Sequence, residues 1–210
     1  MKVETALVSV YDKTDIVDFC TTLEEAGVII ISTGGTADVA RKAGLSVSPV
    51  EDITGFTNLM DGRVKTLHTD IYAGILARRG SSDMDILKRE GITPIDMVVC
   101  NFYDPKLGIN EMDIGGPCMI RAAAKNWQNV AVVSHPSQYK HVAAVLPNLS
   151  EDMRRGLAYE AVRRTAYYDA LIAGQDDNYN FPELFVPPFQ MEQVLRYGEN
   201  PHQRLSLIHI

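Results

Sequence analysis

This 210-residue sequence is poor in several features that define common protein classes. It has three cysteines, Cys20, Cys100 and Cys118, with no C-x-x-C pair and no His/Cys spacing typical of zinc. No apolar run is long enough to cross a bilayer, and residues 1–5 lack the pattern of a signal peptide. These absences predict a soluble, cytoplasmic protein with reduced thiols, no metal and no membrane association.

Positive charge is also scarce. The chain has 20 Lys and Arg against 27 Asp and Glu, a formal net charge of −7, which argues against binding nucleic acid through bulk charge. An anionic ligand would therefore need a local group of cations. The 46% hydrophobic content is ordinary for a globular protein and predicts one main domain with a smaller appendage.

What the sequence does contain is an alternation of strand and helix patterns. The predicted strands are 6–10, 28–32, 46–50, 97–100 and 130–133, and the predicted helices are 13–26, 36–43, 83–90, 117–125 and 137–146. Residues 52–79 carry several glycines and are predicted to be mostly a long loop around 71–76. This order predicts an α/β fold, with a parallel sheet flanked by helices on both faces.

The pattern changes after Pro147. A helix-rich segment, 151–173, is followed by a tail that contains proline and aromatic residues. We predict a main domain at 1–147, a helical extension of it at 148–177 and a separate tail at 178–210.

The segment Val28–Thr36 passes from a β-branched run into Gly34-Gly35 and then a helical pattern. Ligands of parallel sheets bind beyond the carboxyl ends of the strands. Paired glycines allow a ligand close to the backbone, the hydroxyls of Thr33 and Thr36 are donors, and a helix start favours an anion. A phosphate-binding loop and a plain turn with Thr36 as helix N-cap both fit this segment.

Cations and a carboxylate occur near other predicted turns. Arg63 and Lys65 alternate, so an extended backbone would direct both to the same side. Asp113 precedes a second Gly-Gly pair and a helix that carries Lys125 near its end, where a cation also complements the helix dipole. A solvated surface explains each cation alone. The sharper hypothesis is that Lys65, Tyr103, Asp113 and Lys125 form one acid–base group around a phosphorylated ligand.

Two further residues have simple structural explanations. Lys13 could pair with a phosphate at the glycine loop, but a lysine at the start of a surface helix is commonly just solvated. His68 could exchange protons, but a lone histidine more often serves as a structural hydrogen-bonding group. For each residue taken alone, the sequence favours the structural explanation.

Six motifs, in order between Ala6 and about Ala173, closely resemble the IMP cyclohydrolase domain of the bifunctional purine biosynthesis family. They are Ser9–Thr14, Ser32–Ala37, Thr54–Phe56, Gly62–His68, Ala73–Arg78, and Asp113–Gly116 together with Arg121–Asn126. The resemblance implies a methylglyoxal-synthase-like fold and a homodimeric enzyme without cofactor or metal. The implied reaction closes 5-formamidoimidazole-4-carboxamide ribonucleotide (FAICAR) to IMP with loss of water, the last step of de novo purine biosynthesis.

The resemblance also assigns site residues. Lys65, Tyr103, Asp113 and Lys125 match the catalytic positions of the family. The residues implied to hold the substrate are Ser9, Val10, Lys13, Thr33, Gly34, Gly35 and Thr36 at the ribose phosphate, and Arg63, Thr66, Cys100, Asn101, Ile114, Gly115 and Gly116 around the base. We expect Asp113 to accept a proton from the carboxamide nitrogen, while Lys65, assisted by Tyr103 or Lys125, donates one to the formyl oxygen.

The sequence departs from the family pattern after Tyr103. Asp104-Pro105 follows it where the family usually has Pro-Phe, and the link to Asp113 is shorter than usual. Residues 195–203 resemble the entry to a transformylase domain, and since the chain stops at Ile210 we expect no transformylase activity; a separate AICAR transformylase could be a partner. For the apolar end, 205–210, packing on the body, pairing with another chain and disorder all stay open.

Two other functions compete with the cyclohydrolase. A nucleotide- or phosphate-sensing module would share the phosphate loop but would have no use for Lys65, Asp113 and Lys125. A methylglyoxal-synthase-type lyase acting on a triose phosphate would also share the loop. It would not explain the run from Asp113 to Lys125.

Overall fold

The computed structural model describes residues 1–56, 59–175, 184–195 and 205–209. The chain divides into two compact units. The first comprises 1–103 and 113–164, and the second comprises 104–112 and 165–210. The predicted boundaries at 147 and 177 remain a prediction of the sequence.

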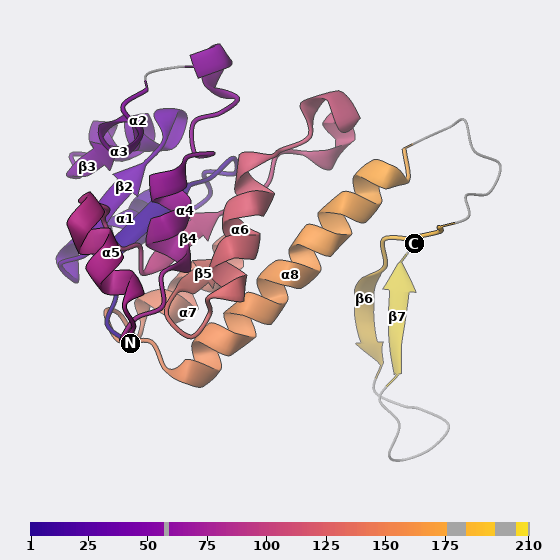
Figure 1. Ribbon diagram of the computed structural model, residues 1–210. Coiled ribbons are helices and arrows are strands. Elements are labelled where there is room, and N and C mark those ends of the chain that lie inside the picture. The colour runs from indigo at the N-terminus through magenta and orange to yellow at the C-terminus, as the bar shows by residue number, and fades with distance from the viewer. Residues whose placement is uncertain (57–58, 176–183, 196–204, 210) are drawn as a thin grey trace. The chain divides into compact units, whose positions relative to one another are not determined.

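The first unit contains a five-stranded parallel sheet in the order β3-β2-β1-β4-β5 (Figure 1). The strands are β1 (Thr5–Ser9), β2 (Ile29–Ser32), β3 (Val47–Pro49), β4 (Met97–Cys100) and β5 (Ala131–Val133). At the centre, Leu7 of β1 lies opposite Ile31 of β2 and Val98 of β4. The predicted parallel sheet is therefore confirmed, and its carboxyl edge collects the ends of all five strands.

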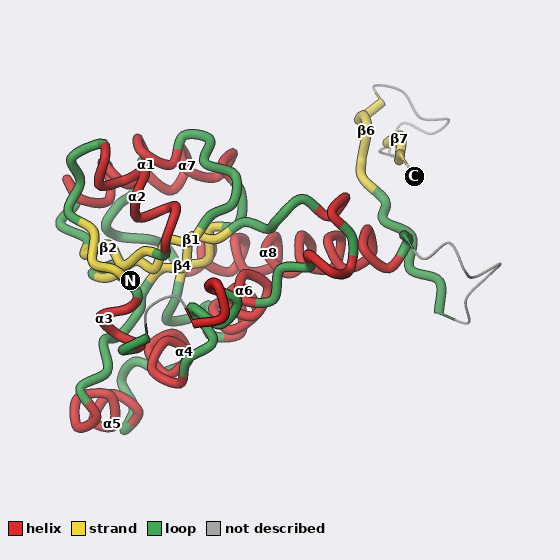
Figure 2. The backbone as a smooth tube through the Cα atoms, turned by 90° about the horizontal axis from the view of Figure 1, so that it is seen from above, coloured by secondary structure: helices red, strands yellow, loops and turns green. Residues whose placement is uncertain are grey.

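Helices cover both faces of this sheet, as Figure 2 shows from above. The helices are α1 (Ile16–Glu25), α2 (Gly34–Lys42), α3 (Glu51–Thr54), α4 (Thr69–Leu76), α5 (Asp83–Glu90), α6 (Gly115–Lys125), α7 (Tyr139–Ala143) and α8 (Glu151–Ala173), the last of which runs through both units. Successive strand residues point to opposite faces, so Val8 packs with residues of α1, α2 and α7, and Leu7 packs with residues of α4 and α6. The predicted helices on both faces are confirmed.

Several predicted elements have the observed bounds, including α5, β4 and α8. The prediction that much of 52–79 is a long loop around 71–76 is only partly correct. It contains α3, a short 3-10 helix (Leu59–Gly62) and α4, which buries Ile71 and Ile75. The signal is weak because α4 is short and carries Gly74, where an added Cβ would lie 2.5 Å from the Thr93 carbonyl oxygen.

Other boundaries also differ. The predicted helix 137–146 is a 3-10 turn, Pro136–Gln138, followed by the short α7. In the second unit, β6 (Gln190–Leu195) pairs antiparallel with β7 (Leu205–His209), so the apolar end pairs with a strand of its own chain. The segment 196–203, which resembles a domain entry, lies outside the described residues.

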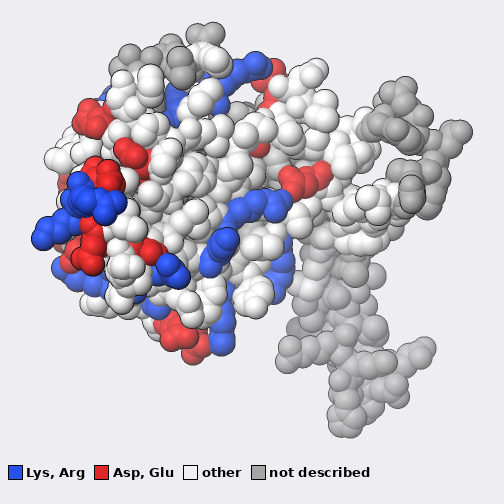
Figure 3. All heavy atoms as spheres, viewed as in Figure 1, with Lys and Arg blue, Asp and Glu red and all other residues white. Residues whose placement is uncertain are grey.

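Charged residues of both signs lie close together on one helix. On the face drawn in Figure 3, acidic and basic side chains intermingle over α5. Its residues Asp83, Asp85, Lys88 and Arg89 supply both signs. Within the described ranges, no helix is long and apolar enough to cross a membrane.

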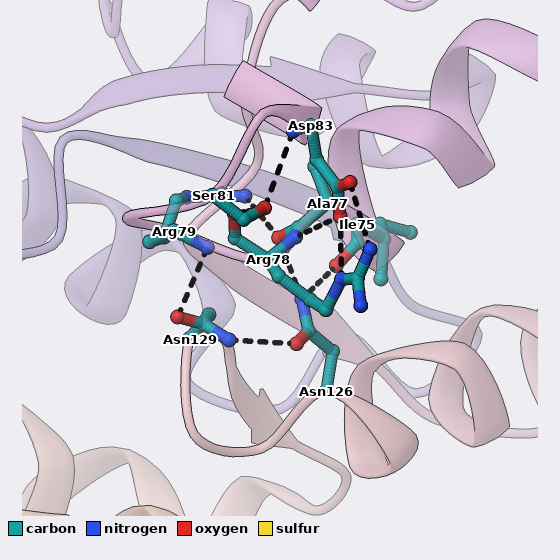
Figure 4. A network of polar contacts seen from close by, with 8 residues as sticks. All are labelled: Ile75, Ala77, Arg78, Arg79, Ser81, Asp83, Asn126 and Asn129. Carbon is teal, nitrogen blue, oxygen red and sulfur yellow. Dashed lines mark hydrogen bonds and ion pairs between the residues drawn. The ribbon is translucent and has the colours of Figure 1, made fainter. Parts of the chain in front are cut away.

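A polar network joins the carboxyl ends of α4 and α6 (Figure 4). Asn126, which follows α6, donates from Nδ2 to the carbonyl oxygens of Ile75 at 2.7 Å and Ala77 at 3.0 Å. Asn129 binds Asn126 and accepts from the backbone N–H of Arg79. Because these carboxyl ends meet, and Thr66, just before α4, reaches Gly115 at the start of α6, the two helices run parallel and start together at the carboxyl edge of the sheet.

Candidate active site

The end of β1 is held to the start of α2 by hydroxyl groups. Ser9 Oγ lies 2.8 Å from Thr33 Oγ1, and Thr36 Oγ1 both accepts from the Val10 N–H at 3.1 Å and donates to the Val10 carbonyl at 3.0 Å. Thr33 is the N-cap and α2 begins at Gly34, so the alternative with Thr36 as N-cap is wrong. The glycine pair therefore lies inside the first helical turn, with its N–H groups at the carboxyl edge.

Lys65 lies against this helix start. A Cβ added to Gly34 would stand 2.9 Å from Lys65 Nζ, and one added to Gly62 would stand 2.2 Å from Lys65 Cε. Both glycines have positive φ, +29° and +83°, which most residues rarely adopt. The Lys65 side chain therefore passes over Gly62 and ends at Gly34, with its ammonium group beside the positive end of α2.

The neighbouring residue, Thr66, reaches the other helix start. Its hydroxyl would lie 2.7 Å from a Cβ on Gly115, and its side chain is buried. Residues 63–66 form turns, with the Leu67 N–H donating to the Val64 carbonyl at 3.1 Å. The extended conformation assumed for Arg63 and Lys65 is therefore wrong. Instead, consecutive residues of one turn connect the two helices that begin with Gly-Gly.

Asp113 caps the second helix start. Its Oδ1 accepts from the Gly116 N–H at 2.9 Å, and the Tyr103 backbone N–H also donates to it. Burial raises the pKa of Asp113, against these two hydrogen bonds, which lower it. A carboxylate with a raised pKa is a stronger base than an ordinary aspartate, which suits proton abstraction near neutral pH.

The loop after β1 is fixed by Asn101. Its Oδ1 accepts from the N–H groups of Tyr11 at 2.7 Å and Asp12 at 2.9 Å, and its Nδ2 donates to the Asp12 carbonyl at 3.0 Å. The Asn101 side chain thus shapes the loop. Lys13 folds back to donate to the carbonyls of Val10 and Tyr11, and burial lowers its pKa.

Cys100 and Ile114, two of the predicted site residues, differ in their exposure. Burial raises the pKa of the Cys100 thiol well above its usual range, and the nearby Asp113 charge adds to the effect. Cys100 is therefore a neutral thiol at pH 7. Ile114 is 48% exposed at the N-cap of α6, where its side chain is available to a ligand.

Tyr103 and Lys125 differ in their relation to Asp113. Tyr103 is 46% exposed and its backbone binds Asp113. Lys125 is exposed in the last turn of α6, about 15 Å along the helix axis from Gly115 at 1.5 Å per residue. In one copy of the chain, the structure brings Lys65, Tyr103 and Asp113 to the same edge of the sheet and leaves Lys125 at the far end of α6.

The structure gives His68 a structural role, in agreement with the simpler interpretation. Its Nδ1 accepts from the Asp70 N–H at 3.2 Å and thereby caps α4. His135 likewise caps the turn after β5, together with Gln138. In the part of the chain that the structure describes, no cluster of His, Cys, Asp or Glu side chains could hold a metal ion.

Two tyrosines near the site had not been predicted as site residues. Tyr11 packs its ring against Tyr103, with centroids 5.3 Å apart. Tyr72 of α4 places a buried hydroxyl in the neighbourhood of Cys118 and Asp113. For Tyr11 the sequence offers one signal, since it follows a strand at the carboxyl edge, and for Tyr72 we find none.

The class of protein is defined by its fold. Two helices that begin with a Gly-Gly pair start at the carboxyl edge of a parallel sheet. The MGS-like domain model matches residues 15–128, more than half of the chain, and the chain belongs to this family. The model of the AICARFT/IMPCHase bienzyme matches residues 123–209.

Within the class, the chain is similar to the bifunctional purine biosynthesis protein PurH. It is 43% identical to that of Ruminiclostridium cellulolyticum over 221 residues, covering 96% of this chain and 43% of the relative. It is 43% identical to that of Bacillus subtilis over 224 residues, covering 98% of this chain and 44% of the relative. The chain thus spans less than half the length of these relatives and corresponds to their MGS-like, IMP cyclohydrolase region.

A solved structure also matches. It is described as the crystal structure of ForH, has a TM-score of 0.74 and 35% sequence identity, and covers 81% of this chain and 97% of that chain. The fold predicted from the sequence is therefore confirmed by an independent structure.

Proposed function

We propose that this chain is an IMP cyclohydrolase that closes FAICAR to IMP with loss of water. The observation that carries the proposal is the turn at 63–66, which joins the two glycine-started helices. Lys65 lies at the start of α2 and Thr66 at the start of α6. A ribonucleotide has two parts to bind, a phosphate and a base, and each helix start offers N–H groups to one of them.

The phosphate belongs at α2. The N–H groups of Gly34 and Gly35, the hydroxyls of Ser9 and Thr33, and the Lys65 ammonium surround this helix start. The dipole of α2 adds positive potential there, which an acidic chain requires locally. Lys13 completes the group if it releases its backbone carbonyls on binding.

The chemistry belongs at α6. The carboxamide nitrogen attacks the formyl carbon, a C–N bond forms, and Asp113 accepts the nitrogen proton. Lys65, with Tyr103 assisting, protonates the formyl oxygen to a hydroxyl group. The hydroxyl takes a second proton from Asp113 and leaves as water, while the former formamide nitrogen gives its proton to Lys65 and the C=N bond forms. The two nitrogens lose as many protons as the oxygen gains, so Asp113 and Lys65 return to their starting states, and no electrons are exchanged with the protein.

The test is turnover by the purified chain. FAICAR is added without folate or metal, and IMP is followed by chromatography against a protein-free blank. We expect catalytic IMP formation that falls at least about 100-fold in Lys65→Ala and Asp113→Ala. Lys42→Ala, which removes an exposed lysine at the far end of α2, is the matched control.

Each outcome is decisive. Loss of turnover in both folded site variants, with Lys42→Ala unchanged, supports the cyclohydrolase. Saturable FAICAR binding by the wild type without IMP formation would instead make the protein a nucleotide-sensing module.

A further inference from the structure

An aromatic pair stands at the edge of the site. The rings of Tyr11 and Tyr103 have centroids 5.3 Å apart and planes tilted by 54°. Tilted pairs at this distance are favourable because the positive edge of one ring meets the negative face of the other. Both rings remain accessible to solvent, Tyr11 at 50% and Tyr103 at 46%.

Tyr103 lies where the chain leaves the first unit. The strand β4 ends at Cys100, and Tyr103 is the last residue before the segment 104–112, which belongs to the second unit. Tyr103 therefore does not belong to a strand or helix of the first unit. Its backbone N–H is fixed at Asp113, but this bond does not set the direction of the ring. The orientation of the ring therefore depends on its side-chain contacts.

Tyr11 is the fixed member of the pair. Its N–H donates to the buried Asn101 side chain at 2.7 Å, and its carbonyl accepts from Lys13 Nζ at 3.2 Å. It also directly follows Val10, whose backbone is held on both sides by Thr36. A ring on this anchored backbone can restrict the orientation of the ring that it contacts.

We propose that Tyr11 is a positioning residue that holds the Tyr103 ring beside Asp113 in the productive orientation. The inference rests on the proposed function, because it assigns Tyr103 a part in the same reaction. The contact is made by the faces and edges of the rings, and the Tyr11 hydroxyl takes no part. Phenylalanine at position 11 therefore retains the function, whereas alanine loses it.

The kinetic test compares Tyr11→Ala with Tyr11→Phe. An aromatic pair of this kind contributes a factor of about two to ten to an equilibrium, and kcat for IMP formation is expected to fall by that factor in Tyr11→Ala, with KM nearly unchanged. Tyr11→Phe retains wild-type kcat. Tyr159→Ala, which removes an exposed tyrosine from α8, is the matched control and leaves kcat unchanged.

The double variant separates positioning from a direct role. In a Tyr103→Ala background, Tyr11→Ala is expected to cause no further loss, since its target is absent. An additive loss in the double variant, or a Tyr11→Phe enzyme as slow as Tyr11→Ala, would overturn the inference.

A spectroscopic readout does not depend on activity. In protein carrying ring-labelled tyrosine, the Tyr103 resonance is identified by its loss in Tyr103→Phe. It is expected to shift in Tyr11→Ala and to stay unchanged in Tyr159→Ala. An unshifted Tyr103 resonance in Tyr11→Ala contradicts the inference even in an active enzyme, whereas a wild type that makes no IMP contradicts the proposed function and leaves the ring contact testable.

Discussion

At the scale of single residues, Asp113 shows how stability and function oppose each other. Burial raises the pKa of its carboxyl above the ordinary value of 3.8, although N–H groups of Gly116 and Tyr103 bind it. The folded protein therefore holds this proton more tightly than the unfolded chain. The stability contributed by the protonated form is fully present at low pH and is lost as the pH rises from 3.8 through the raised pKa.

Asp113→Asn should therefore raise the unfolding temperature at pH 7. It should also lower the rate of IMP formation by about 100-fold or more. The asparagine oxygen can still accept from Gly116, and the cost of burying a charged carboxylate is gone. The gain in unfolding temperature should disappear at acidic pH. In the wild type, turnover should fall as the pH is lowered through the raised pKa, because Asp113 must be ionised to act as a base.

Asp83→Asn is the control, because the pKa of Asp83 is shifted in the opposite direction to that of Asp113. The Arg78 side chain lowers the pKa of Asp83 and binds it through two nitrogens, at 2.8 and 3.0 Å. Its stabilisation is present above the ordinary pKa and is lost on acidification, so this variant should be less stable at pH 7 and fully active. A destabilised or active Asp113→Asn protein would contradict the prediction.

At the scale of elements, the site depends on parallel helices that start at the same edge. The polar network around Asn126 holds α4 to α6 at their carboxyl ends, and Thr66 meets Gly115 at the other end (Figure 4). Glycine at the start of α6 is needed for space. A Cβ on Gly116 would lie 2.5 Å from Asp113 Oδ2.

Gly116→Ala should therefore displace the Asp113 carboxylate and lower kcat by about 10- to 100-fold, as for a displacement of about 1 Å. Gly156→Ala is the matched control, because no atom lies within 4 Å of the added Cβ on the exposed face of α8. It should stabilise the protein by about 1 kcal/mol through helix propensity and leave kcat unchanged. Urea unfolding and IMP formation measure both effects, and full activity in Gly116→Ala would contradict the argument.

At the scale of the whole molecule, the position of Lys125 bears on whether two copies of the chain assemble. One helix length separates it from the start of α6, so one copy cannot place it beside Asp113. If it acts in catalysis, as the family resemblance implies, it must reach the site of a second copy. The homodimer that the family resemblance implies would make this possible.

Mixing two inactive variants tests this. Lys125→Ala and Asp113→Ala carry their defects on different copies in a hybrid dimer, which leaves one of its two sites intact. Equal mixing with subunit exchange should restore about a quarter of the wild-type activity. Differently tagged copies establish that hybrids form. Hybrids without activity would show that Lys125 acts in its own copy, and a Lys125→Ala protein that is fully active by itself would show that Lys125 has no catalytic role.

The sequence by itself determined what depends on neighbouring residues. Helix 83–90 and strand 97–100 have the predicted bounds because periodicity and a glycine stop are local signals. The two Gly-Gly pairs and the order of strands and helices likewise indicate the class of fold. The short helix α4 was missed because Gly74 weakens its signal, while its packing against Thr93 and Ile95 requires that glycine.

Only the tertiary structure decided which of these residues meet. The turn at 63–66 joins Gly34 to Gly115, and Tyr11 contacts Tyr103. Each relation spans a long stretch of sequence. No local pattern encodes such distances, because they follow from the order of the strands in the sheet and from the packing of α4 against α6.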